Sequence, residues 1–163
     1  MQSLGDSPEV RGLVAALTPK VQGCVGELQA QCVGMALYGL QSLGNSPEVR
    51  GLVAVLTPKV HGCTEELKAQ EVSNALYGLQ SLGDSPEVRG LVAALTPKVQ
   101  GCVGELQAQC VGMALYGLQS LGNSPEVRGL VAVLTPKVHG CTEELKAQEV
   151  SNALYGLQSL GDS

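Results

Sequence analysis

One four-residue string, QSLG, recurs along this chain at an unvarying spacing of 39 residues. Its copies begin at Gln2, Gln41, Gln80, Gln119 and Gln158. An internal period between about 20 and 50 residues is typical of folds in which each unit buries its apolar face against its neighbours. The repeat therefore restricts the chain to a solenoid-like array before any other property is considered.

The repeats come in two versions that alternate. Residues 2–40 recur unchanged at 80–118, and residues 41–79 recur unchanged at 119–157, so the order is A-B-A-B. Residues 158–163 are the partial start of a fifth unit, and we expect residues 1–163 to form a single repeat domain. Natural repeats diverge independently, so two identical copies of one A-B pair indicate either very recent duplication or deliberate construction. We favour construction.

The differences between types A and B are concentrated in one segment. Six of the nine fall between residues 64 and 74 of type B, where type A has a small or apolar side chain in place of a polar one at every position except Gln29. This exchange predicts an apolar interface strip in every second repeat, with Cys32, Met35, Cys110 and Met113 as candidates. The alternative is neutral variation, or repacking around the loop between two helices. The nine pairs, type A first, are Asp6/Asn45, Ala16/Val55, Gln22/His61, Val25/Thr64, Gly26/Glu65, Gln29/Lys68, Cys32/Glu71, Gly34/Ser73 and Met35/Asn74.

Each unit carries the signals of a first long helix. Ser-Pro-Glu at residues 46–48 is typical of a helix N-cap, a first-turn proline and an acidic residue at the positive end of the helix. Thr57-Pro58 interrupts this helix, because proline lacks an N–H and disfavours a helical residue before it. We expect a kink there, or a new short helix from Pro58 to about His61. The apolar face is formed by Val49, Leu52, Val53 and Leu56.

A second helix is predicted to begin between Glu65 and Ala69 and to end at Gly83, a position that suits a left-handed glycine cap. Gly51 and Gly78 lie inside the two expected helices, where each costs about 1 kcal/mol relative to alanine. Close approach of neighbouring helices is the favoured reason for these glycines, and a functional hinge is the alternative. The apolar stripe of the second helix is Val72, Ala75, Leu76, Leu79 and Leu82.

The repeat length and the interrupted first helix resemble the HEAT and armadillo class of helical solenoids. Residues 69–83, AQEVSNALYGLQSLG, resemble the second-helix signature of octotricopeptide-like repeats. These resemblances imply an all-α, right-handed α-α superhelix of four 39-residue repeats. The octotricopeptide resemblance also implies RNA binding along one face, but Lys and Arg total 10 against 15 Asp and Glu, and this acidic balance disfavours RNA.

Composition excludes several further classes. Apolar residues make up 44% of the chain, yet Phe and Trp are absent, so the core must consist of Leu, Val and Ala. Glycines, prolines and charges break every apolar run, and we expect no membrane span. The first residues lack the basic and apolar regions of a signal peptide. We therefore expect an intracellular location for a natural protein, or the cytoplasm of an expression host for a constructed one.

No pattern in the chain predicts catalysis, a cofactor or a metal. The cysteines form no C-x-x-C pair, and those of neighbouring units should lie about 10 Å apart, beyond the roughly 7 Å that a disulfide allows. We expect buried or half-buried thiols, with intermolecular pairing or deliberate labelling as the alternative. His61 and His139 match no ligand spacing, and Glu65 and Glu66 point about 100° apart on a helix. The cysteines are Cys24, Cys32, Cys63, Cys102, Cys110 and Cys141.

The two ends of the chain stop at the same phase of the repeat, MQSLGDS and QSLGDS, without the polar capping units that most solenoids need. Complementary ends predict a head-to-tail homo-oligomer, either a ring or an open filament. The sequence therefore predicts a non-catalytic helical-repeat scaffold that self-associates. The alternative is a binding module that holds a peptide or protein, or single-stranded RNA, on one face.

Overall fold

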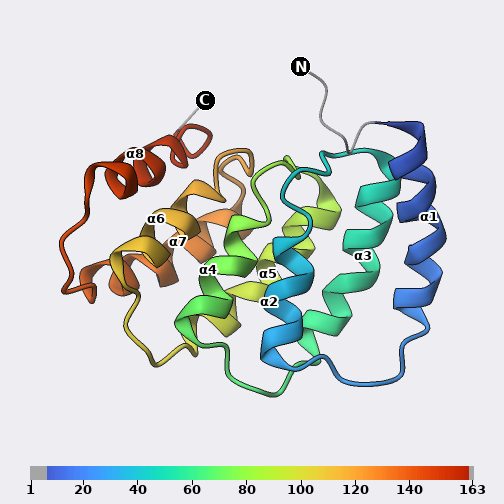
Figure 1. Ribbon diagram of the computed structural model, residues 1–163, viewed down its shortest axis with the longest axis horizontal. Coiled ribbons are helices and arrows are strands. Elements are labelled where there is room, and N and C mark those ends of the chain that lie inside the picture. The colour runs from blue at the N-terminus through green and yellow to red at the C-terminus, as the bar shows by residue number, and fades with distance from the viewer. Residues whose placement is uncertain (1–6, 162–163) are drawn as a thin grey trace.

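A computed structural model describes residues 7–161, which form eight α-helices and no strand (Figure 1). Residues 2–6 of the first unit and residues 162–163 of the partial fifth unit lie outside the described residues. The long helices are α1 (Pro8–Gln22), α3 (Pro47–His61), α5 (Pro86–Gln100) and α7 (Pro125–His139). The short helices are α2 (Ala30–Tyr38), α4 (Ala69–Tyr77), α6 (Ala108–Tyr116) and α8 (Ala147–Tyr155).

The helices are arranged in two rows. Each long helix contacts the next long helix, and each short helix contacts the next short helix, so that every unit stacks on its predecessor. Helices α1 and α8 consequently lie at opposite ends of the molecule (Figure 1). The predicted all-α fold is confirmed: the chain is a superhelix of helical repeats with the 39-residue period of the sequence.

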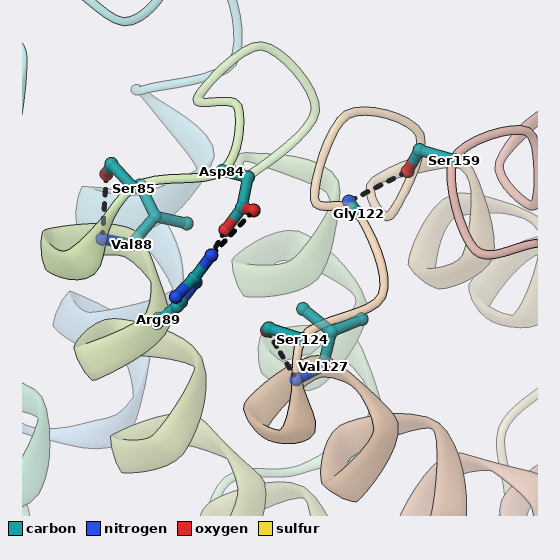
Figure 2. Close-up of polar contacts among 8 residues, drawn as sticks. All are labelled: Asp84, Ser85, Val88, Arg89, Gly122, Ser124, Val127 and Ser159. Atoms are coloured by element: carbon teal, nitrogen blue, oxygen red, sulfur yellow. Dashed lines mark hydrogen bonds and ion pairs between the residues drawn. The ribbon is translucent and has the colours of Figure 1, made fainter. Parts of the chain in front are cut away.

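Every long helix begins as its Ser-Pro-Glu signal predicts. The N-cap serine side chain accepts a hydrogen bond from the amide three residues later, at 3.2 Å for Ser85 and 3.3 Å for Ser124 (Figure 2). Proline occupies the first helical turn, and an acidic residue follows it. These caps satisfy backbone donors that a helix N-terminus otherwise leaves free.

Of the two alternatives predicted at Thr57-Pro58, a kink or a new short helix, the structure excludes the new helix. A new helix does not start at Pro58, because α3 runs unbroken to His61 with Pro58 inside it. In the last turn this proline removes a single bond, to the carbonyl of Ala54. Ala54 is exposed, so water can replace the missing donor. Thr57 also donates its hydroxyl to the Val53 carbonyl at 2.9 Å, which keeps the turn helical.

The second helix is also shorter than predicted. It begins at Ala69, within the expected range, but ends at Tyr77 rather than at Gly83. Between Tyr77 and Gly83 the backbone forms tighter turns, with hydrogen bonds three residues apart. Leu79 N donates to Leu76 O at 3.0 Å, and Leu82 N donates to Leu79 O at 3.1 Å. Gly83 itself has φ +73°, which confirms the left-handed turn.

The two glycine columns differ in their surroundings. A methyl group added at Gly78 would lie 1.7 Å from the carbonyl oxygen of Leu37 in the preceding unit, which confirms close approach there. At Gly51 the prediction of close approach is wrong, because nothing lies within 4 Å of the added atom. Of these two columns, only that of Gly78 is required by packing between units.

The core is built from aliphatic side chains, as the composition predicts. Leucines and valines from both helix rows are almost fully buried along the stack. The four tyrosines stand apart from this core and stack on one another, with ring centroids 5.4 Å to 5.6 Å apart and planes about 20° from parallel. The tyrosine stack comprises Tyr38, Tyr77, Tyr116 and Tyr155.

Candidate self-association interface

The junction between residues 46–83 (α3, α4 and the turn after α4) and residues 85–122 (α5, α6 and the turn after α6) joins a type B helix pair to the following type A pair. Polar contacts to backbone atoms cross it on both sides of the core. Lys98 Nζ donates to the carbonyl of Cys63, which follows the C-terminus of α3 and so lies where a cation is favoured. Gly83 N donates to Ser120 Oγ at 3.0 Å. We call this arrangement the B-to-A junction.

The backbones also touch at the B-to-A junction. A methyl group added at Gly117 would lie 1.8 Å from the carbonyl oxygen of Leu76. No side chain fits at this point, so the glycine lets the end of α6 rest directly against the end of α4. Tyr77 and Tyr116 stack beside this contact, with ring centroids 5.6 Å apart. The junction is therefore closed from the helix ends to the leucine core.

One side of each long helix faces the preceding unit, and at α1 this side is open. Leu13 and Leu17 are 67% and 47% exposed. Their equivalents in α5, Leu91 and Leu95, are 0% exposed. The same positions remain buried in α7, although no unit after α7 covers them, so the preceding unit must provide the burial. We call this the first outer face, and it also carries the exposed thiols of Cys24 and Cys32.

The opposite side of the last helix pair is open in the same way. Leu154 in α8 is 63% exposed, whereas its equivalents Leu37 and Leu76, each of which has a following unit, are 0% exposed. Position 37 is buried without any preceding unit, so here the following unit provides the cover. We call this the last outer face. Its other exposed apolar residues are Leu145, Val150, Tyr155 and Leu157.

Each outer face contains an apolar cavity. The cavity on the last outer face has a volume of about 220 Å³, and its lining includes His139 and leucines of α6, α7 and the turns that follow α6 and α8. The cavity on the first outer face has a volume of about 300 Å³ and is lined by Leu17, Val21, Leu28 and Cys24, among others. At the B-to-A junction the side chains equivalent to these linings are mostly buried.

The other kind of junction, A-to-B, carries bonds that involve the residues in which A and B differ. Glu65 accepts a hydrogen bond from the Ala30 amide at 2.7 Å, and so caps the short helix of the preceding unit. Glu27 accepts from the Thr64 amide at 3.0 Å and from its hydroxyl at 2.7 Å. These two bonds, the hydroxyl first, lower the pKa of Glu27 below its ordinary value.

The two junctions also differ in the sizes of the side chains that pack at equivalent positions. Gly34 of type A packs against Glu71 of type B, whose Cα lies 3.2 Å from an added methyl group. The corresponding positions at the B-to-A junction are the buried Ser73 and Cys110. Glu71 also accepts from the amide of Lys68 at 2.8 Å and caps its own helix, which Cys32 cannot do in type A. The alternation therefore places the small Gly34 against the large Glu71. It also alternates a cap from the helix's own unit, a cis cap, with a cap from the following unit, a trans cap.

Type A and type B also differ at the turn before the long helix. Asp84 pairs with Arg89, with a 2.8 Å contact from Nε to Oδ1 (Figure 2). The hydrogen bond from Arg89 lowers the pKa of Asp84. Type B has Asn45 here, and Arg50 donates instead to the Asn45 carbonyl. Both solutions hold the arginine over the same turn.

The predicted interface residues do not share one environment. Cys32 is exposed, Met35 is 64% exposed, Met113 is half-buried and Cys110 is buried. Met35 and Met113 do meet on one surface, because both line a cavity of about 360 Å³ that crosses α2, α4 and α6. The remaining residues of that lining are Tyr38, Gln70, Asn74 and Gln109.

The cysteines and histidines were the side chains considered for disulfide or metal chemistry. All six cysteines are free: three are buried and Cys141 is half-buried, as predicted, but Cys24 and Cys32 are exposed, because no unit covers them. His61 and His139 are exposed at helix ends. No group of three His, Cys, Asp or Glu side chains within residues 7–161 is arranged to hold a metal ion.

Sequence reasoning identified the position of Gly39, as an equivalent of Gly78, but not Lys20 or Ser42; these three are the equivalents of residues that form the B-to-A junction. The signal was present in the perfect repetition, since residues 78 positions apart are the same. The sequence alone does not show which of the residues shared by all repeats make contacts across a junction.

No protein-family model, curated protein or solved structure matches the chain. Among residues 7–161, every helix is too short or too polar to cross a lipid bilayer.

Proposed function

We propose that this chain is a non-catalytic helical-repeat scaffold, of constructed or idealised sequence, that associates head to tail through its two outer faces. The observation that carries the proposal is the exposure of leucines that the same sequence buries elsewhere. Leu13 and Leu154 lie on the two outer faces, and their equivalents Leu91 and Leu76 pack into the B-to-A junction. A second copy can supply the missing cover on each side.

The occupant of the outer faces follows from continuity with an existing interface. Residues 119–157 have the sequence of residues 41–79, and residues 2–40 have the sequence of residues 80–118. The last outer face of one copy and the first outer face of another therefore carry the same side chains as the two sides of the B-to-A junction. Burial of apolar surface favours this contact by about 25 cal/mol for each Å² removed from water.

Size-exclusion chromatography with light scattering over a range of protein concentrations tests the proposal. We expect the wild-type mass to rise above that of the monomer as concentration increases. Leu13→Glu places a charge on the first outer face and should keep the chain monomeric at concentrations where the wild type associates.

Ala15→Glu is the matched control, because it adds the same charge two residues away on α1. Ala15 is exposed, and its equivalents Ala54, Ala93 and Ala132 are exposed as well, so this column does not contact a neighbouring unit. The control should associate like the wild type. A wild type that stays monomeric throughout the range would contradict the proposal.

A second candidate is a binding module for an extended peptide. The cavity across α2, α4 and α6 favours it, because Met35 and Met113 offer apolar contacts while Gln70 and Asn74 can bond a peptide backbone. The tyrosine rings beside it already stack on one another, which leaves no gap for a nucleotide base. Selection from a random peptide library, with loss of binding in Met113→Glu, supports this candidate; a salt-sensitive shift of single-stranded RNA instead would contradict it.

A further inference from the structure

We infer that Gly39 sets the register of the head-to-tail joint, by letting the carbonyl of Leu154 in a second copy rest against its Cα. This inference rests on the proposed self-association and specifies its contact at the level of the backbone. Gly39 thereby becomes a specificity-determining residue of the interface.

Three glycines in the same column already make this contact within the chain. A methyl group added at Gly78, Gly117 or Gly156 would lie 1.7 Å, 1.8 Å and 1.7 Å from a carbonyl oxygen of the preceding unit. The carbonyls belong to Leu37, Leu76 and Leu115, which occupy equivalent positions. The contact is thus a constant feature of both junction types.

Gly39 is the member of this column with no such neighbour. The atom nearest to a methyl group there would be the carbonyl oxygen of Ala36, in the same helix, at 3.5 Å. Its backbone is right-handed, with φ −66° and ψ −15°, so an alanine fits without strain. Nothing within residues 7–161 requires a glycine here, whereas a joint equivalent to Gly117 on Leu76 does.

The same register would continue, across the joint, three other contacts that repeat between successive units. Tyr38 would stack on Tyr155 of the second copy, as Tyr116 does on Tyr77. Lys20 would reach the Cys141 carbonyl, as Lys98 reaches that of Cys63.

Ser42 would accept from the Gly161 amide, as Ser120 does from Gly83. Cys24 and Cys32 would be covered, because their equivalents Cys102 and Cys110 are 1% and 8% exposed at the internal junction. An association that used the apolar faces in another register, or that paired two first outer faces, would reproduce none of these contacts.

The test compares wild type, Gly39→Ala and Gly12→Ala by light scattering and by thermal unfolding followed with circular dichroism. Gly12 is a helical glycine with nothing within 4 Å of an added methyl group, so it controls for the change in helix propensity. Gly39→Ala should fold as well as wild type but associate at least tenfold more weakly. Gly12→Ala should associate like the wild type.

Thiol counting with a small aromatic disulfide gives a second reading of the same joint. We expect the two exposed thiols, Cys24 and Cys32, to react quickly in Gly39→Ala at concentrations where the wild type already associates. They should become protected in the wild type as it associates. If the wild type associates and Gly39→Ala associates equally, with equal protection, the role of Gly39 is overturned while self-association stands. If the wild type never associates, the proposed function itself fails.

Discussion

The A-to-B and B-to-A junctions share one architecture but differ in their polar contacts. Both contain a glycine against a carbonyl, a lysine on the end of the preceding long helix, a serine on a glycine turn and a pair of stacked tyrosines. Only the A-to-B junction adds the Glu65 cap and the Glu27–Thr64 bonds. The shared contacts therefore specify stacking, and the additional ones distinguish alternate junctions.

This difference defines the A-B pair as the structural unit. Type A has no acidic residue to cap its short helix and takes one from the following type B unit. Type B caps its own short helix with Glu71 and needs nothing from the following unit. A chain divided at a B-to-A junction therefore loses no trans cap, whereas a chain divided at an A-to-B junction does.

The largest expected effect comes from filling the shared backbone contact. Gly117→Ala should destabilise the chain by about 3 kcal/mol or more, because its methyl group cannot coexist with the Leu76 carbonyl and two units must separate. Gly78→Ala should act similarly at the A-to-B junction. Urea denaturation measures both changes.

Gly51→Ala is the control for this substitution. It lies in a helix with open space around it and should stabilise the chain by about 0.5 to 1 kcal/mol. Equal destabilisation at Gly51 and Gly117 would mean that backbone approach does not decide the requirement for glycine.

A smaller effect is expected from exchanging side-chain size at one junction. Gly34→Ser introduces the type B residue into type A and should cost about 1 to 2 kcal/mol, because its Cβ lies 3.2 Å from the Glu71 Cα. Adding Glu71→Cys in the same chain removes the Glu71 Cγ, which lies 3.3 Å from the added Cβ, and should relieve part of this strain, while it also removes the Glu71 helix cap. A double-mutant cycle by thermal unfolding measures the coupling, and strictly additive effects would argue against size matching.

Removal of the trans cap should cost about 1 kcal/mol. Glu65→Ala leaves the Ala30 amide at the start of α2 without its acceptor. Hydrogen exchange at that amide should accelerate while exchange in α4, which has its own cap, stays unchanged. Glu66→Ala, at the exposed neighbouring position, should leave both rates as they are.

The smallest expected change is in the pKa of one carboxyl group, that of Glu27. Folding lowers the pKa of Glu27, so its bonds to Thr64 stabilise the chain fully above the ordinary carboxyl pKa of about 4.3 and lose their effect as pH falls through the lowered folded value. Thr64→Val, which installs the type A residue, should raise the Glu27 pKa toward that ordinary value. Carboxyl NMR titration measures it, with Glu105, still bonded to Thr142, as the internal reference.

Local chemistry predicted the beginnings of elements better than their ends. Ser-Pro-Glu fixed each long-helix start, and the left-handed glycine was placed correctly, because each depends on residues within one turn. The end of α4 was misplaced, because Leu79 and Leu82 continue the apolar pattern in a turn tighter than an α-helix. Buried side chains were therefore predicted correctly even where the backbone was not.

The sequence predicts only part of the candidate interface. The phase of the repeat predicts complementary ends, but it does not indicate which residues would form the proposed joint. Gly51 and Gly78 look alike in the sequence, and only contact with the preceding unit separates an open position from a closed one. The A/B differences likewise act between residues 35 to 37 positions apart, which no local pattern can pair.

The tyrosine stack gives the molecule an optical signal of its own. The chain contains no tryptophan, so tyrosine dominates its near-ultraviolet absorption and emission. Each junction brings two rings to within 5.6 Å, close enough for their transitions to interact, and opening a junction separates one such pair. Loss of stacking can therefore be followed without any added label, one ring pair for each interface between units.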